Sequence, residues 1–297
     1  MATFAKSTFS ASSYATFRPT YPPSLYNAIL AYHRGPRRLC LDLGCGPGTV
    51  SRALAPHFSR VIGTDPSPNM ITQARKSIAD QPAYSHVEFH LGAAEAIPSD
   101  IVSDGTVDCV VAGQAAHWFD FTRVWPVLRR LVRPGGTLAF WGYKDHVFVD
   151  FPRATEIMQR YAYDSDPDKL GSYWPKGREY LQDHLRIVQP PEQDWEELQR
   201  VEYEPAARGR RSGEGTIFME RALSIAETKD YVRTWSSFHG WQEAHPGQVA
   251  RSKGGVGDVM DEMFDEIARE DGFFREEGNI VNIEWGSALI LARRRAE

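Results

Sequence analysis

The stretch that most constrains the fold is residues 39–65, which read LCLDLGCGPGTVSRALAPHFSRVIGTD. An apolar run from Leu39 to Leu43 ends in three closely spaced glycines, at positions 44, 46 and 48. A helical pattern follows, and a second apolar run ends at Asp65. Strand, glycine turn, helix, strand and terminal acid form the front half of a nucleoside-binding βαβ unit.

The flanking sequence extends this unit into a larger sheet. Strands are predicted over residues 38–43, 60–64, 86–91, 108–112 and 137–141, and helices over 22–32, 68–79 and 122–131. A further helix, with its apolar residues at i, i+3 and i+4, starts near Val50. Strict alternation of strands and helices predicts an α/β fold, with a mostly parallel sheet and helices on both faces.

The alternation ends after Tyr143. The remainder predicts a short strand at 201–203, a polar glycine-rich loop at 205–216, helices near 227–239 and 256–270, and a terminal strand at 280–291. We therefore expect helical lid insertions and not a second domain. The expected single domain spans 1–297: an N-terminal arm and helix (1–35), a cofactor-binding core (36–143), a lid with the remaining sheet elements (144–275) and the terminal strand (276–297).

Composition limits the partners. The net charge of −5 argues against a general nucleic-acid surface, and no apolar run reaches the 18 residues that a membrane span needs. Three cysteines without a secretory signal predict reduced thiols and a cytoplasmic location. Residues 1–18 faintly resemble a transit peptide, but two basic residues are few for one, which favours a mobile arm. His239 and His245 lack neighbours at metal-ligand spacing, so no metal is expected.

The chemistry of the glycine loop narrows the choice of nucleoside. A dinucleotide site requires G-x-G-x-x-G, but Thr49 stands at the third glycine position, and Pro47 removes one backbone donor. Asp42 would repel a phosphate and suits a positively charged amine or sulfonium. Asp65 ends the second strand, where a carboxylate can accept hydrogen bonds from both ribose hydroxyls. The loop therefore favours S-adenosylmethionine over NAD, although a purely structural glycine turn stays open.

Five segments together resemble class I S-adenosylmethionine-dependent methyltransferases. LDLGCGPGTVSRALA is similar to their first motif, VIGTDPSPNMITQAR to the second, FHLGAAEAIP to the adenine segment, and DCVVAGQAAHWFD and LRRLVRPGGTLAFW to the strand-four and strand-five motifs. The match runs in order over about residues 14–143. The subgroup it most resembles acts on small molecules and carries an HWF signature, similar to fungal trans-aconitate methyltransferases. In that subgroup a YxxxRPxYP arm precedes the sheet, and here Tyr14 to Pro22 fit that pattern.

The resemblance implies a Rossmann-like, doubly wound sheet of seven strands with an antiparallel terminal strand, and S-adenosylmethionine as cofactor. It implies that Gly44, Gly46 and the backbone near Cys45 contact the amino-acid part of the cofactor, that Met70 packs near the adenine, and that Gln114 sits beside the transferring methyl. Many relatives carry Asp after the glycine that follows strand three. Here Ala93 and Ala94 follow Gly92, so the adenine contact comes from the backbone or from elsewhere.

Aromatic residues follow strands four and five, at the edge of the sheet where ligands bind. Trp118, Trp141 and Tyr143 are candidate pocket walls, together with Tyr21 and the inserted Trp174, and core packing is the competing interpretation for these residues. His117 is a candidate general base, or an orienting group. Tyr14 and Arg18 are candidate arm residues that close over the substrate, with Arg18 pairing a carboxylate.

The leading hypothesis is a metal-free methyltransferase that modifies an oxygen of a small molecule, a carboxylate or a natural-product hydroxyl. The alternatives are a protein that binds the cofactor without transferring methyl (a partner subunit, lyase or cyclase) and a nicotinamide oxidoreductase. Neither the acceptor nor the oligomeric state is indicated by the sequence.

Overall fold

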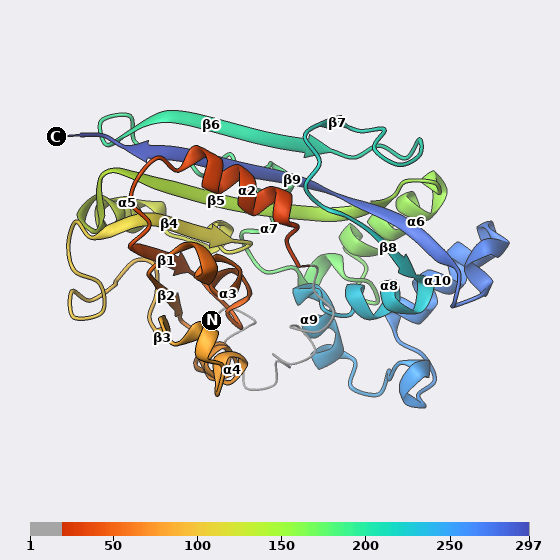
Figure 1. Cartoon of the computed structure of the whole chain (residues 1–297). Coiled ribbons are helices and arrows are strands. Elements are labelled where there is room, and N and C mark those ends of the chain that lie inside the picture. Colours follow the sequence, from red (N-terminus) through yellow and green to blue (C-terminus); the bar gives the residue numbers. More distant parts are fainter. Residues whose placement is uncertain (1–19, 297) are drawn as a thin grey trace. The chain divides into compact units, whose positions relative to one another are not determined.

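The computed structural model describes residues 20–296 (Figure 1). These residues form two compact units. The core unit contains residues 20–144, 179–202 and 287–296, and the insertion unit contains residues 145–178 and 203–286. Within the described chain, no helix is both long enough and apolar enough to cross a membrane.

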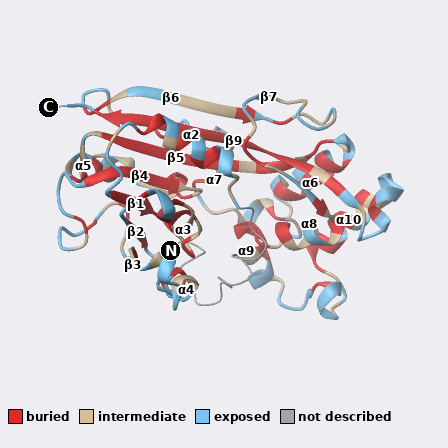
Figure 2. Ribbon diagram, viewed as in Figure 1, coloured by how far each residue is buried: buried red, intermediate tan, exposed pale blue. Residues whose placement is uncertain are grey.

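The core unit is built on the predicted parallel strands. β1 (Leu39–Leu43) pairs in parallel with β2 (Arg60–Asp65) and with β4 (Val107–Gly113); β2 pairs with β3 (Val87–Leu91), and β4 with β5 (Val132–Phe148). β1 and β4 are buried along nearly their whole length (Figure 2). Strands buried on both faces read as continuous apolar runs, which is why the sequence located them.

The strand order is β3-β2-β1-β4-β5-β9-β6-β7, and β8 pairs with β9. This confirms the Rossmann-like α/β fold. β6 covers Trp195–Glu204, and β9 covers Ile280–Arg294 and runs opposite to β5 (Figure 1). Within residues 20–296 the sheet has nine strands where we expected seven. The two extra strands are short: β7 (Glu214–Gly215) lies in the predicted loop, and β8 (Glu220–Ser224) had no prediction.

The helices of the core unit occupy their predicted positions. They are α2 (Pro23–Tyr32), α3 (Thr49–Leu54), α4 (Pro68–Ile78) and α5 (Phe121–Leu131). α7 covers Arg178–Gln182. The 3-10 turns of the core unit are η2 (Ala55–His57), η3 (Pro82–Tyr84) and η4 (Ala116–Trp118), and those of the insertion unit are η5 (Gly171–Tyr173), η6 (Arg251–Lys253) and η7 (Gly272–Arg275). Ser67 caps α4 and Asp120 caps α5, each accepting a backbone N–H bond. The predicted stripe on α5 (Val124, Leu128 and Leu131) is buried.

β5 is much longer than the predicted 137–141. Residues 133–136 form a bulge within the strand: Val132 pairs with Val107, and Thr137 pairs with Cys109. Gly135 adopts a φ of +72° there, which a glycine tolerates without strain. A proline-glycine sequence predicts a turn, but the flanking β4 partner holds both sides of the bulge in one strand.

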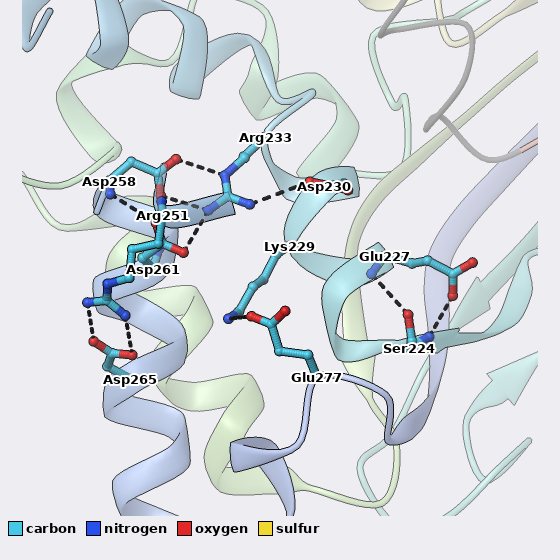
Figure 3. A network of polar contacts seen from close by, with 10 residues as sticks. All are labelled: Ser224, Glu227, Lys229, Asp230, Arg233, Arg251, Asp258, Asp261, Asp265 and Glu277. Atoms are coloured by element: carbon cyan, nitrogen blue, oxygen red, sulfur yellow. Dashed lines mark hydrogen bonds and ion pairs between the residues drawn. The ribbon is translucent and has the colours of Figure 1, made fainter. Parts of the chain in front are cut away.

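The insertion unit contains α6 (Pro152–Tyr163), α8 (Ile225–Val232), α9 (Ser236–Ala244) and α10 (Val259–Glu270). The helix predicted near 227–239 is in fact two helices, because the chain leaves helical geometry at Trp235, which precedes α9 with φ −66° and ψ 142°. α8 begins with a capping box in which Ser224 and Glu227 bond each other's backbone N–H groups (Figure 3).

A network of ion pairs joins the end of α8 to the start of α10 (Figure 3). Arg233 donates to Asp258 at 2.8 Å and to Asp261 at 2.9 Å, and all three side chains are buried. Asp261 also accepts the backbone N–H of Arg251, whose guanidinium binds Asp265. Each acid of this network therefore faces an arginine.

Candidate functional site

The glycine loop between β1 and α3 is fixed by its own backbone. Cys45 N–H donates to Thr64 of β2 at 3.0 Å, and Gly48 N–H donates to Cys45 at 3.0 Å. Gly48 has a φ of +82° at the start of α3, and a Cβ on it would lie 2.5 Å from the ring of Phe89. This glycine is therefore required for packing as well as for backbone geometry.

Gly44 and Gly46 serve different purposes. A Cβ on Gly44, which has a φ of +65°, would approach the Cβ of Ala115 to 2.6 Å, so its absence lets the loop pack against the end of β4. Among residues 20–296, a Cβ on Gly46, at φ +52°, would meet nothing within 4 Å. The backbone at Gly46 therefore borders open space, as a ligand-binding turn requires.

Asp65 ends β2 and faces this loop. Its Oδ2 accepts the N–H of Gly46 at 2.9 Å, and its Oδ1 accepts the N–H of Ser67 at 2.8 Å. Burial raises the pKa of Asp65, and the two backbone N–H groups oppose the rise. Each carboxylate oxygen keeps further lone-pair capacity, so Asp65 can still accept hydrogen bonds from two ribose hydroxyls.

Asp42, on β1, is completely buried. Its Oδ2 accepts a 2.6 Å hydrogen bond from the Ser51 hydroxyl on α3, while its Oδ1 has no partner among residues 20–296. Burial raises the pKa of Asp42 to about 7; the Ser51 bond opposes this rise and the nearby Asp65 carboxyl adds to it. The sequence did not single out Ser51, whose only signal is a polar side chain on the buried face of α3.

Cys45, Met70 and Ala94, three of the predicted cofactor contacts, are all buried in the core unit. Met70 lies in the first turn of α4, where Ser67 caps its backbone N–H at 3.4 Å. Gly92 N–H donates to the carbonyl of Asp65, which fixes the start of the segment that contains Ala94. Burial raises the pKa of the Cys45 thiol well above its usual value, and the charges of Asp42 and Asp65 raise it further. The Cys45 side chain is therefore an uncharged thiol.

Gln114 holds the ends of β4 and β5 together. Its side chain donates to the Tyr143 carbonyl at 2.8 Å and accepts the Tyr143 N–H at 2.7 Å. Its φ of +56° is rare for a residue with a side chain and turns the chain sharply after β4. The side-chain amide predicted to lie beside the methyl group thus already binds backbone, and the Gln114 N–H donates to the Trp141 carbonyl at 2.8 Å.

His117 and Trp118 lie in η4, directly after this turn. His117 is buried, Trp118 is partly buried, and their rings lie 4.5 Å apart. Trp141 and Tyr143 are both buried on β5, and Tyr21 packs edge-on against Trp141 at 5.2 Å and against Tyr143 at 6.4 Å. The indole N–H of Trp141 has no partner among the described residues.

Trp174 belongs to the insertion unit. Its ring lies 6.1 Å from the stacked ring of Tyr163 and 5.6 Å from that of Trp235. The guanidinium of Arg178 lies 4.4 Å from the Trp174 ring and is bonded to Asp145 and Tyr163. Sequence reasoning missed Arg178 and Asp145, because they stand 33 positions apart and no motif links them.

Two predicted site residues, Tyr14 and Arg18, lie outside the residues that the structure describes. Over the described part of the chain, no three His, Cys, Asp or Glu side chains are grouped so that they could hold a metal ion. Open space at Gly46, the lone-pair capacity of Asp65 and the unpartnered oxygen of Asp42 fit a ligand that has ribose hydroxyls and a positive charge. S-adenosylmethionine has both.

Comparison with known proteins gives the same result. A family described as "Methyltransferase domain" matches residues 41–140. A Saccharomyces cerevisiae protein named "Probable S-adenosylmethionine-dependent methyltransferase CRG1" is 29% identical, over 97% of this chain and 96% of its own length. A Dictyostelium discoideum protein assigned as a methyltransferase is 28% identical, over 95% and 92%.

A solved structure from Anaeromyxobacter dehalogenans, described as a candidate type II methyltransferase, has a TM-score of 0.67 and 25% identity, covering 93% of this chain and 98% of its own. The family match lies on β1 to β5, the elements that carry the glycine loop and Asp65. Residues 41–140 therefore form a methyltransferase domain, and nearly the whole chain is similar to S-adenosylmethionine-dependent methyltransferases.

Proposed function

We propose that this methyltransferase acts on an oxygen atom of a small molecule, either a carboxylate or a natural-product hydroxyl. The observation that carries this proposal is the environment of Arg178 in the insertion unit. Its guanidinium stacks on Trp174 and binds Asp145 and Tyr163, yet its Nε is buried without a partner among residues 20–296. A planar, fixed donor beside aromatic rings suits an oxygen acceptor with a flat or apolar body.

The cofactor roles follow from the loop. We assign Asp65 to the ribose, Gly44, Cys45 and Gly46 to the amino-acid part, and Met70 and Ala94 to the adenine. Asp42 contributes negative charge near the positively charged part of the ligand. The Gln114 turn lies at the end of β4, next to the element that carries His117.

The reaction requires alignment more than acid or base strength. The bound cofactor supplies an electrophilic methyl group on a sulfonium. Proximity and orientation contribute roughly 7–11 kcal/mol in well-aligned reactions. A carboxylate acceptor needs no base, whereas a hydroxyl acceptor would use His117 to remove its proton. Trp118, Trp141, Tyr143 and Tyr21 would exclude water, and Tyr14 and Arg18 would close over the acceptor.

The partner expected from these features is a small molecule and not a nucleic acid or a membrane, consistent with the net charge of −5. We also infer a cytoplasmic location from the sparse cysteines; all three thiols are free.

The test incubates the protein with methyl-labelled S-adenosylmethionine and separate panels of small carboxylic acids, phenols and amines. Label in an acid or phenol product is expected. Alkali then releases labelled methanol from a methyl ester but not from a methyl ether, which separates the two oxygen acceptors. Label confined to amine products would contradict the oxygen assignment. Binding of S-adenosylmethionine with no labelled product in any panel would favour the non-transferring alternative.

A variant tests the role of Arg178. Arg178→Lys keeps the charge but loses the planar fork, and we expect KM for the acceptor to rise about tenfold, or about 1.4 kcal/mol, with Kd for S-adenosylmethionine unchanged. Arg153→Lys is the matched control, since Arg153 lies exposed on α6 and pairs with exposed Glu156. Equal KM values for both variants would remove Arg178 from acceptor recognition.

A further inference from the structure

The carboxyl group of Asp42 has an unusual environment for a buried acid. It is 0% exposed, one oxygen binds only the neutral Ser51 hydroxyl, and the other binds nothing among the described residues. No basic side chain of residues 20–296 bonds it. An ionised carboxylate in such a place loses its hydration without gaining a counter-charge, which is unfavourable.

The groups that face Asp42 come from each element around it. They are Tyr26 on α2, Cys40 on β1 itself, Cys45 in the glycine loop, Ser51 on α3 and Asp65 on β2, and the β4 residue paired with Asp42 is Val111. All of these groups are neutral or acidic.

Arg52 is the basic group next to this set. The charge of Arg52 acts to lower the pKa of Tyr26. The Arg52 guanidinium itself donates to the Pro47 carbonyl at 2.8 Å and to the Ser77 hydroxyl. It therefore does not compensate Asp42. The combined effect of burial and the Asp65 charge raises the pKa of Asp42 to about 7, so near neutral pH a large share of the protein carries a proton there.

The charge that Asp42 lacks is the charge that the cofactor carries. S-adenosylmethionine has a sulfonium in addition to its ammonium, while the product S-adenosylhomocysteine has a neutral thioether. A positive charge near a carboxyl group favours the ionised form, and its loss favours the protonated form. Asp42 therefore experiences a different field in the two complexes.

We propose that Asp42 is a specificity-determining residue that exchanges a proton with solvent as the charge of the bound ligand changes. Its O–H bond breaks when S-adenosylmethionine binds, and the proton passes to the buffer. The bond forms again, with a proton from solvent, when S-adenosylhomocysteine occupies the site. The exchange makes the protein favour the cosubstrate over its own product. The proposal rests on the cofactor of the family and not on the acceptor.

Calorimetric titration at pH 7 in two buffers of different ionisation enthalpy counts the protons released by each ligand. We expect wild-type protein to release about 0.5 proton more with S-adenosylmethionine than with S-adenosylhomocysteine, because about half of the molecules are protonated when the pH equals the pKa. Asp42→Asn, which mimics the protonated group in shape, should lose this extra proton release. Any proton from the ligand's own ammonium is common to both proteins and cancels.

The pH dependence gives a second readout. From pH 6 to pH 8 the ionised fraction of Asp42 rises from about one tenth to about nine tenths, so the preference for S-adenosylmethionine over S-adenosylhomocysteine should rise about tenfold. Ser51→Ala removes a bond that favours the ionised form and should move the midpoint to higher pH. Glu88→Gln, an exposed change on β3, should leave both readouts unchanged.

Equal proton release with both ligands by the wild-type protein, or an Asp42→Asn profile that matches wild type, would overturn the proposal while leaving the cofactor assignment intact. Failure of the folded wild-type protein to bind S-adenosylmethionine at all would overturn both. If Asp42→Asn does not fold, the wild-type proton counts and the Ser51→Ala midpoint still decide the question.

Discussion

Two pairs of buried acids, one beside the glycine loop and one between α8 and α10, are held by different partners. Within residues 20–296, Asp42 and Asp65 of the core unit accept hydrogen bonds only from a hydroxyl and from backbone N–H groups. In the insertion unit, Asp258 and Asp261 accept bonds from the guanidinium of Arg233 (Figure 3). The pKa of Asp261 is lowered: burial acts to raise it, but the backbone N–H of Arg251 and the charge of Arg233 outweigh burial. The pKa values of Asp42 and Asp65 are raised, mainly by burial.

This difference separates two uses of a buried charge. An acid paired with an arginine is already satisfied and ties elements of the chain together, so it offers nothing to a ligand. An acid held only by neutral donors keeps its unbalanced charge for a cation that arrives later. Asp65 and Asp42 are of the second kind, and both lie next to the glycine loop.

The largest effect should come from making Asp258 and Asp261 resemble Asp42 and Asp65, which have no arginine partner among residues 20–296. Arg233→Met removes the arginine that faces Asp258 and Asp261 and leaves both buried without it. We expect a loss of about 3–5 kcal/mol in the free energy of unfolding, measured by urea denaturation. The matched control is Lys229→Met on α8, whose partner Glu277 is 62% exposed and whose ion pair contributes at most about 1 kcal/mol. Equal losses for both variants would contradict the comparison.

His146 provides a test of whether a buried group that has no hydrogen-bond partner among residues 20–296 can have a purely structural role. Both ring nitrogens lack partners among residues 20–296, and the ring packs on Phe148, Tyr231, Trp235 and Trp285. Burial lowers the pKa of His146 to about 4, with Asp145 opposing this.

The folded pKa of His146 thus lies below the unfolded value of about 6.5, so the unfolded chain gains the proton first as pH falls. Stability should decrease by up to about 3 kcal/mol between pH 6.5 and pH 4. His146→Phe should lose this part of the pH dependence in thermal unfolding. An unchanged pH profile in the variant would assign the acid lability to other groups.

The smallest effect should be the same in both units. Ser224→Ala removes the hydroxyl that caps α8, and Asp120→Ala removes the carboxylate that caps α5. Each should cost about 1 kcal/mol in thermal unfolding. Capping bonds of this kind involve no buried charge, so a clear difference between the two variants would contradict this expectation of equal losses.

The sequence predicted the core unit far better than the insertion unit, for local reasons. The apolar runs of β1 and β2, the glycines and the stripe on α5 are adjacent in the sequence and reveal their structure without help from distant residues. β8 forms by pairing with β9, and the extension of β5 before Thr137 forms by pairing with β4. No local sequence pattern predicts either pairing.

The same distinction applies to the candidate site. Asp42 and Asp65 are recognisable because strand ends and spacing identify them. Arg178 and Asp145 meet only after the insertion unit folds, and the Ser51–Asp42 bond requires α3 to lie against β1. Local sequence patterns do not predict contacts between residues that are far apart in the sequence.

The most direct test of the account is calorimetric binding of S-adenosylmethionine to wild-type protein and to Asp65→Ala. Two hydrogen bonds to a charged acceptor are each worth about 1.5 kcal/mol or more, so Kd should rise on the order of a hundredfold. Glu88→Gln, which removes one negative charge from an exposed position on the neighbouring strand, should leave Kd unchanged. A Kd for Asp65→Ala within about twofold of the wild-type value would contradict the assignment of the β2 acid to the cofactor.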